Sequence, residues 1–298
     1  QIVDKKDWKW SLSGNIGFNK SKISELGLLP SDFGFLGENI GYYGNSIGDH
    51  FGVGHIFLEG KAPGLFFGYV TQGIVQPEDI TDQGVKYIKK DGTVGYYQTF
   101  NKVAPVAGDI KFVDNDGDGD VNVNDRDIIG DPNPDFTYGF STSISWKNLS
   151  LSAAFTGVQG RDILNTNNRY INTPGTKSNN LTRKAFQNMW TESNHSNLYP
   201  SSTFVVQNYV MDRYVEDGSY LRCSDITLNY VLPKVWMKKI GFQNASVYAS
   251  VKNAFIITDY SGYDPEVNSF AFDGLRPGVD MSSYPTPRSF IFGLNLTF

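Results

Sequence analysis

Apolar and polar residues alternate along several segments of the chain, which is the period of a β-strand with two different faces. The last segment, residues 287–298, places an apolar side chain at every even position from Phe290 to Phe298. The dipeptide Lys147-Asn148 separates two further alternating segments and predicts a hairpin turn. The same alternation predicts five more strands, at residues 7–19, 136–147, 149–157, 220–231 and 244–256.

The polar faces of these strands carry mostly Ser, Thr, Asn and Gly, whereas the outer faces of soluble sheets usually carry Lys, Glu and Arg. Lys9, Asp225 and Lys252 are the charged residues on these faces. An apolar face against lipid and a weakly polar face against a wet interior would produce this pattern. Periodicity therefore favours a transmembrane β-barrel, while a soluble β-sandwich stays open as the alternative.

The connections between the strands alternate between short and long. Two residues join the strands of the predicted hairpin and about a dozen follow residue 231, whereas residues 158–219 and 257–286 are long connections. Outer-membrane barrels alternate in this way, with short periplasmic turns and long external loops. By this parity residues 20–135 form one long outer loop, and the apolar run Gly64–Tyr69 belongs to the structure of that loop.

Aromatic residues make up 14% of the chain, and several of them gather at one end of the predicted strands. These are Trp8, Trp10, Trp146, Trp236 and Phe298. Aromatic girdles of this kind mark the boundary between membrane and water. Trp190 lies instead in a long loop, where residues 181–190 have a short amphipathic helical pattern.

Composition narrows the fold class to all-β. Charged residues are only 19% of the 298, while 31 are Gly, a mixture that suits strands and turns. Cys223 is the single cysteine, which excludes an intrachain disulfide. No apolar window is long enough for a transmembrane helix. The net charge of −5 is concentrated in residues 109–135, which contain nine aspartates and two basic residues, Lys111 and Arg126. This acidic balance excludes a nucleic-acid surface.

Residues 114–125 match a twelve-residue calcium loop. Such a loop has oxygen ligands at alternate positions, Gly at position 6 (here Gly119), a backbone carbonyl at position 7 and a carboxylate at position 12. The sequence therefore predicts a structural calcium site with the metal ligands Asp114, Asp116, Asp118, Asp120 and Asp125. Aspartate at position 12 reaches less far than the usual glutamate, and the extended segment before the loop argues against an EF-hand sensor. A solvated Asp/Gly turn is the alternative.

Catalytic candidates are weak. His50, His55 and His195 have no nucleophile or metal-ligand pattern near them in sequence, so each is expected to be a loop or surface histidine. No phosphate-binding loop or dinucleotide motif is present. We expect no catalytic residues, no organic cofactor and no enzymatic activity.

The predicted strands are too few for a closed transport barrel, and an open sheet edge in lipid would leave backbone groups unpaired. The N-terminus has neither an initiator Met nor an apolar signal segment. We therefore expect the whole chain, residues 1–298, to be the C-terminal portion of a larger barrel.

Together these features resemble the C-terminal part of the SusC/RagA family, the TonB-dependent outer-membrane transporters of Bacteroidota. The resemblance is carried, in order, by residues 108–114, 125–134, 138–140, 217–222, 251–255, 262–266 and 284–290. Upstream, residues 64–73 resemble the aromatic-glycine stretch that precedes the acidic loop in this family.

The resemblance implies a 22-stranded barrel that crosses the outer membrane of a Gram-negative bacterium many times. It also implies an N-terminal plug, energy from TonB and a SusD-like lipoprotein over the outer mouth, with glycans or peptides as the imported substrate. The plug, the N-terminal strands and the region that contacts TonB are absent from these residues. The chain would then supply barrel wall and outer loops, and Phe298 resembles the terminal signal of the assembly machinery.

A function of another class also fits the residues. A soluble, calcium-stapled β-sandwich could bind carbohydrate through exposed aromatic side chains. The candidates for such stacking are Tyr42, Tyr43, Tyr97 and Trp190.

Overall fold

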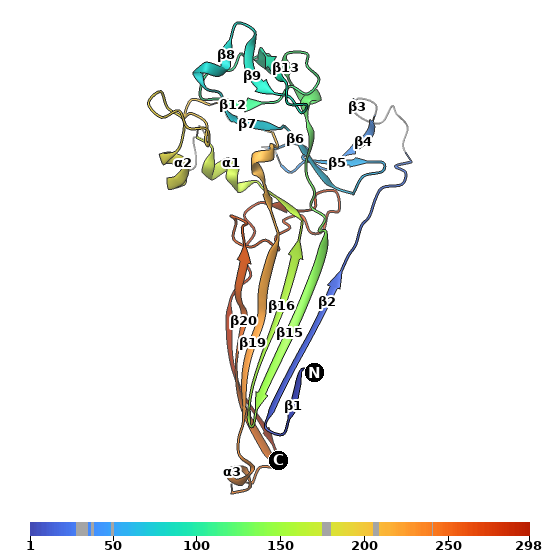
Figure 1. Cartoon of the computed structure of the whole chain (residues 1–298), viewed down its shortest axis with the longest axis vertical. Helices are drawn as coiled ribbons and strands as arrows, with labels where there is room; N and C mark the ends of the chain where they lie inside the picture. Colours follow the sequence, from blue (N-terminus) through green and yellow to red (C-terminus); the bar gives the residue numbers. More distant parts are fainter. Residues whose placement is uncertain (28–34, 37–38, 49–50, 175–179, 205–208, 240) are drawn as a thin grey trace.

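A long antiparallel sheet with a folded head at one end makes up the molecule, seen here as a computed structural model (Figure 1). The structure describes residues 1–27, 35–36, 39–48, 51–174, 180–204, 209–239 and 241–298. None of the helices in these described residues is long and apolar enough to cross a bilayer.

The long sheet has seven strands in the order β1-β2-β15-β16-β19-β20-β22, and every neighbouring pair is antiparallel. Its strands are β1 (Val3–Lys5), β2 (Trp8–Gly17), β15 (Phe136–Trp146), β16 (Leu149–Gln159), β19 (Tyr220–Val231), β20 (Asn244–Thr258) and β22 (Ser289–Thr297). Strands therefore lie at all six segments where alternation predicts them, and β1 is an addition that its short length hid.

The turn between β15 and β16 is as tight as the sequence predicts, because Lys147 adopts a positive φ of 52°. The connection from β19 to β20 is also short and contains helix α3 (Lys234–Lys239). Both connections lie at the end of the sheet away from the head (Figure 1).

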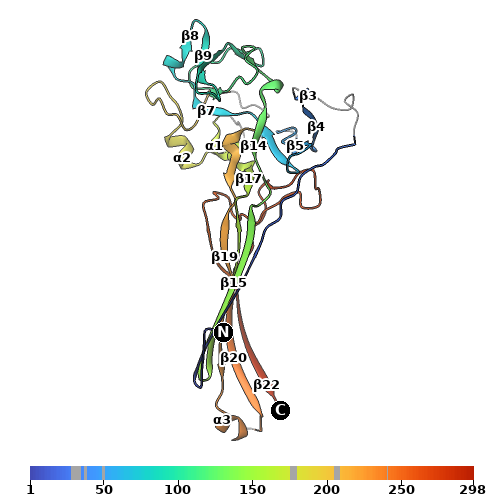
Figure 2. The same cartoon turned by 45° about the vertical axis from the view of Figure 1, so that its right-hand side comes forward.

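Register aligns the apolar residues of neighbouring strands into continuous rows. One row crosses the sheet through Trp10, Ile144, Leu151, Leu228, Ala249 and Phe292. We call the side of the sheet that carries this row the apolar face. Figure 2 shows the sheet as a single twisted layer below the head.

The head is built mainly from the residues between β2 and β15, which the sequence analysis assigns to one long loop. Its strands from this region are β3 (Phe35–Leu36), β4 (Asn39–Tyr43), β5 (His55–Leu58), β6 (Leu65–Gly68), β7 (Thr71–Ile74), β8 (Ile80–Thr81), β9 (Gly84–Ile88), β10 (Val94–Tyr97), β11 (Thr99–Phe100), β12 (Ile110–Phe112), β13 (Asp120–Val121) and β14 (Asp127–Gly130). The run Gly64–Tyr69 supplies β6, the second strand of the five-stranded sheet β14-β6-β5-β4-β3.

Later segments of the chain complete the head. They contribute β17 (Asp162–Asn165), β18 (Val215–Asp217), β21 (Val279–Asp280), α1 (Asn167–Asn172) and α2 (Arg183–Gln187). Among the described residues, 3-10 turns occur at η4 (Asp212–Tyr214) in these later segments and at η2 (Pro77–Asp79) and η3 (Val123–Asp125) in the region before β15. The amphipathic pattern at 181–190 thus forms a helix that is shorter than the pattern.

The main hydrophobic core of the described residues lies in the head and is rich in aromatic rings. Tyr69 packs edge-on against Phe100 and Phe112, and the last two rings stack 4.3 Å apart. The seven-stranded sheet contributes few buried apolar residues, because no second layer of the described residues packs against its apolar face. The head therefore folds around its own core and the sheet does not.

Two predictions about single residues are wrong. His55 is not a loop or surface residue: it lies fully buried in β5, against the edge of Phe66. Tyr97 and Trp190 are not exposed, at 0% and 8% of their full accessibility, because both belong to the head core. His195 is exposed as expected, and His50 lies outside the described residues.

Candidate functional site

The acidic loop, residues 114–125, lies in the upper part of the head, between β12 and β14, and contains β13 and η3 (Figure 1). β12 pairs with β7, and β13, inside the loop itself, pairs in parallel with β11. β14, which follows the loop, pairs with β6, so residues 114–125 lie between two paired strands and contain a third. This attachment gives the aspartates fixed positions that a free surface turn would lack.

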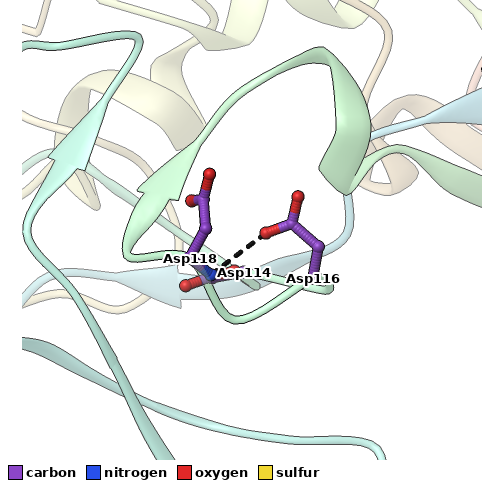
Figure 3. A group of neighbouring side chains, drawn as sticks. All are labelled: Asp114, Asp116 and Asp118. Atoms are coloured by element: carbon purple, nitrogen blue, oxygen red, sulfur yellow. Dashed lines mark hydrogen bonds between the residues drawn. The ribbon is translucent and has the colours of Figure 1, made fainter.

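Three of the five predicted ligands come together. Asp114, Asp116 and Asp118 each offer a carboxylate oxygen, and these oxygens lie within 4.8 Å of one another. Figure 3 shows the three side chains converging from one turn, with the backbone N–H of Asp118 donating to Asp116 Oδ1 at 3.1 Å. Asp114 is buried at the base of the group and the other two are exposed.

Backbone donors organise the turn around Asp114. The N–H of Gly117 donates to Asp114 Oδ1 at 2.6 Å, and the N–H of Gly119 donates to Oδ2 at 2.9 Å. Gly119 has a φ of +88°, and a Cβ there would lie 2.0 Å from the Gln98 side chain. The glycine at position 6 is thus required by both conformation and space, as the sequence motif predicts.

Asp125 is not in this group, although the sequence predicts it as a ligand. It is fully buried, and its carboxylate accepts N–H bonds from Asn115 at 2.7 Å, Asp116 at 3.3 Å and Asn122 at 2.7 Å. Burial raises the pKa of Asp125, and these donors act in the opposite direction. The short side chain at position 12 therefore holds the two ends of the loop together.

Asp120 also turns away from the group. Its carboxylate contacts Lys102 Nζ at 2.6 Å and accepts hydrogen bonds from the Lys102 N–H and the Thr99 hydroxyl. The hydrogen bond from Lys102, followed by the one from Thr99, holds the pKa of Asp120 well below its usual range. Position 7 of a calcium loop needs only its backbone carbonyl, so this side-chain role is compatible with the motif.

The remaining three carboxylates suit a hard divalent cation. Such cations prefer carboxylate oxygens, and calcium accepts irregular coordination. Without a cation the charges oppose one another: partial removal from water, together with the charges of Asp118 and Asp114, raises the pKa of Asp116. The donor set is compatible with calcium, with Asp114, Asp116 and Asp118 as the holding residues.

The sequence motif missed the residue that anchors the loop from outside. The hydroxyl of Tyr87, on β9, donates to the backbone carbonyl of Asp114 at 2.7 Å. Tyr87 is 27 residues from Asp114 in sequence, so no local pattern signals the contact. The alternation of Val85 and Tyr87 on one side of β9 is the only sequence hint that Tyr87 faces inward.

A second polar cluster joins the head end of the sheet to the segment after β20. Arg222, near the start of β19, contacts Asp264 at 2.6 Å and Glu266 at 3.4 Å, and the Tyr220 hydroxyl donates to Glu266 at 2.7 Å. The side chains of Arg222 and Asp264 are only 7% and 6% exposed. We call Arg222, Asp264 and Glu266 the rim cluster.

The rim cluster unites segments that are far apart in sequence. Asp264 also accepts the N–H of Thr286 at 3.1 Å, and the Asn253 side chain donates to the carbonyl of Pro287 at 3.0 Å. The resembling segments at residues 217–222, 251–255, 262–266 and 284–290 therefore meet in one place. Together their contacts hold residues 259–288 against the head end of the sheet.

The chain was compared with known proteins, and no protein-family profile matches it. It is 32% identical over 300 residues to TonB-dependent receptor P3 of Formosa agariphila, an alignment with 99% of this chain and 27% of that protein. It is 29% identical over 302 residues to TonB-dependent receptor SusC of Bacteroides thetaiotaomicron, with 98% of this chain and 25% of SusC.

Solved structures show the same fold. The RagAB peptide importer in the open-open state superposes with a TM-score of 0.69 at 24% identity, covering 100% of this chain and 27% of the other. A structure titled as the RagAB peptide transporter gives a TM-score of 0.70 at 23% identity. The chain thus spans about a quarter of the length of the relatives it matches. These relatives are named as receptors and transporters, in agreement with the expectation that the chain is not an enzyme.

Proposed function

Because this chain belongs to the TonB-dependent receptors of the SusC/RagA type, we propose that it forms barrel wall and outer loops of an importer in a bacterial outer membrane. The imported substrate in this proposal is an oligosaccharide or a peptide. Energy would come from TonB through a part of the protein outside these residues, and a SusD-like lipoprotein would be the partner at the outer mouth.

The exposure of the apolar face is the observation that carries this proposal. Phe292 and Phe290 on β22 are 80% and 66% exposed. Apolar side chains of other strands are exposed as well, among them Leu12 on β2, Leu151 on β16 and Val247 on β20. A single-layer sheet with a bare aromatic and aliphatic face is unstable against water but suits lipid. The soluble sandwich is disfavoured because a sandwich would bury this same face under a second sheet.

The opposite face supports the same arrangement. Asp225 on β19 pairs with Lys252 on β20 at 2.7 Å and accepts hydrogen bonds from Thr227 and Ser250, each at 2.9 Å. An internally satisfied polar network of this kind suits a water-filled lumen. In the proposal the sheet therefore has one face toward lipid and one toward the interior of a barrel.

Position along the sheet favours the head as the outer part. The short connections lie at the end away from the head, and they carry Trp146 and Trp236, which are 52% and 57% exposed. Short turns and a girdle of aromatic residues suit the periplasmic end of a barrel. The head would then face the cell exterior, where a lipoprotein partner and substrate are accessible.

Cell fractionation tests the location and the partner. An antibody against residues 180–200 should detect a band much larger than 33.2 kDa in the outer-membrane fraction. Affinity purification from that fraction in mild detergent should bring down a surface lipoprotein. A 33 kDa band that stays in the aqueous fraction would contradict the proposal.

Transport is tested in cells that lack the gene. Deletion should abolish uptake of the oligosaccharide or peptide on which growth depends, and a deletion of tonB should have the same effect. Uptake that persists in both strains would contradict a role in TonB-dependent import.

We also propose that the acidic loop binds calcium as a structural ion. The three converging carboxylates, the fixed ends of the loop and the glycine at position 6 support this role. Because the loop contacts Tyr87 of β9, an ion there would brace the upper part of the head. It would have no part in any reaction.

A further inference from the structure

A cavity of about 500 Å³ opens in the head between α1, α2 and η4. Its wall contains Asn168, Asn172, Lys184, Arg213 and Glu216, together with apolar patches such as Ile171. The volume is in the range of sites for small ligands. Neither the acidic loop nor the rim cluster contributes to it.

One wall of this cavity is a continuous chain of hydrogen bonds. The Thr182 hydroxyl donates to Asn172 Oδ1 at 2.7 Å, the Asn172 amide donates to Asn168 Oδ1 at 2.7 Å, and the Asn168 amide donates to Glu216. Each amide uses one of its two N–H groups in these bonds. The wall is therefore held in place and still offers donors.

The one carboxylate in the wall is already satisfied. Glu216 accepts hydrogen bonds from Asn165 and Asn168 and from both the N–H and the hydroxyl of Ser261, the last two at 2.8 Å. Its oxygens have four donors and no cation within ion-pair distance among the described residues. Glu216 thus orders the wall without neutralising its basic residues.

Arg213 brings a positive charge without a partner. Its Nη2 donates to the carbonyl of Leu198, its Nη1 is buried without a hydrogen-bond partner, and no carboxylate forms an ion pair with it among the described residues. The adjacent Asp212 is occupied by the N–H and hydroxyl of Thr71. Burial lowers the pKa of Arg213, which reflects the cost of holding this charge away from water.

From this excess of donors and positive charge we propose that the cavity binds an acidic sugar unit of an oligosaccharide. The carboxylate of the sugar would be attracted by Lys184 and Arg213, and its hydroxyls would accept from Asn168 and Asn172. Apolar side chains such as Ile171 would contact the C–H groups of the ring. This inference rests on the proposed function and specifies a substrate class for it.

A peptide ligand fits the cavity less well. An extended peptide is usually held by pairing with an exposed strand, whereas this cavity is lined mostly by helices and loops, and Glu216 on β18 is its one lining residue from a described strand. Side-chain amides and hydroxyls at short spacing suit a ligand with many hydroxyl groups. The experiment must therefore distinguish binding of an acidic peptide from binding of an acidic sugar.

The test uses the intact receptor purified in detergent and isothermal titration calorimetry. The ligands are a short oligogalacturonate, a neutral galacto-oligosaccharide of equal length and an acidic peptide of equal charge. We expect the acidic sugar to bind at least about tenfold more tightly than the neutral one. Equal affinity for the two sugars, or preference for the peptide, would overturn the inference.

Variants of single residues test whether the preference for the acidic sugar arises in the cavity. Lys184→Gln removes an exposed charge, so the fold should survive, and the preference for the acidic sugar should fall about tenfold. Arg213→Gln should reduce it at least as much. Arg183→Gln removes the neighbouring exposed charge on α2, which does not line the cavity, and should leave the preference unchanged. A preference that survives Lys184→Gln and Arg213→Gln would place the site elsewhere.

Failure of this inference can be separated from failure of the proposed function. Uptake of the neutral sugar that depends on the receptor, with no advantage for the acidic one, removes only the acidic-sugar assignment. Uptake of all three ligands that is independent of the receptor removes the proposed function as well.

Discussion

Single residues in the head have structural roles that their neighbours in the sequence do not indicate. His55 is buried in β5, and its Nε2 lies 2.8 Å from the carbonyl of Pro277, 222 residues away. A carbonyl oxygen can only accept, so Nε2 donates this hydrogen bond and carries a proton. Asp125 likewise orders the acidic loop through backbone donors. In both cases burial turns a titratable group into a structural link.

The link through His55 should fail at low pH. Burial lowers the pKa of His55 to about 4, below the 6.5 of an exposed histidine, so the folded head favours the neutral ring. Its contribution to stability is fully present above pH 6.5 and is lost as the pH falls from 6.5 toward 4. Between pH 6.5 and 5 the free energy of unfolding should fall by about 2 kcal/mol from this group.

Thermal unfolding of the intact receptor at pH 7 and pH 5 measures this effect. His55→Gln should be less stable at pH 7 but should lose less stability on acidification. The exposed His195→Gln serves as the control and should behave like the wild type. An identical pH dependence in His55→Gln and the wild type would contradict the assignment.

The acidic loop gives a second prediction for single residues. Because ligand charge sets calcium affinity, Asp116→Asn or Asp118→Asn should weaken binding by about tenfold or more. Terbium can replace calcium as the probe, since the ring of Tyr87 lies beside the loop and can sensitise its emission.

Titration of terbium luminescence, and its displacement by calcium, makes the measurement. Asp91→Asn is the matched control, because Asp91 lies in an exposed turn where it accepts from Thr93 and is outside the acidic group. No saturable signal in the wild type would remove the calcium proposal.

At the scale of elements, each long strand separates two environments. Alternation puts Leu294 on the apolar face and Asn295 on the opposite face of the same strand, β22. Their partners on β20, Val247 and Ser246, repeat the same division. The two faces of one strand should therefore respond differently to the same charge.

We expect Leu294→Arg to destabilise the sheet and Asn295→Arg to be tolerated. An arginine on a lipid-facing position costs about 2–4 kcal/mol near the midplane of the bilayer, whereas one in a wet interior costs little. Denaturant titration of the receptor refolded into lipid vesicles measures the difference. Equal effects of the two substitutions would contradict the orientation of the sheet.

At the scale of the molecule, the rim cluster connects sheet and head. Arg222 belongs to β19, whereas Asp264 and Glu266 belong to the segment that returns from β20 to β22. This segment also contacts the head, since the carbonyl of Pro277 accepts from His55. Buried polar contacts are thus part of what connects the head to the sheet.

Removing the arginine should loosen this connection. Arg222→Met leaves Asp264 buried without its cation, a change that costs about 3–5 kcal/mol for buried pairs. Hydrogen–deuterium exchange should then accelerate in residues 259–288 while the core strands of the head stay protected. Lys9→Met breaks an exposed pair with Asp4 at 3.7 Å and should have almost no effect. Unchanged exchange in Arg222→Met would show that other contacts hold the segment.

The sequence alone determined the long strands. Two-residue alternation is a local property, so it located β2, β15, β16, β19, β20 and β22. It also placed the whole of β19, residues 220–231, although the apolar positions stop alternating before Ile226. There the register shifts at residues 223–225, and such a bulge moves later side chains to the other face. The glycine and aspartate spacing of the acidic loop was equally readable, because it is fixed within twelve residues.

Only the tertiary structure decided what the remaining polar and aromatic residues do. The head strands are two to five residues long, too short for a periodic signal, and their pairing joins distant segments. For this reason the sequence analysis wrongly predicted exposed rings at Tyr97 and Trp190 and a surface position for His55. It could not foresee that Asp120 pairs with Lys102 and Asp125 holds the loop ends, nor that α1, α2 and Arg213 enclose a cavity. These roles depend on contacts across the fold, which no local pattern encodes.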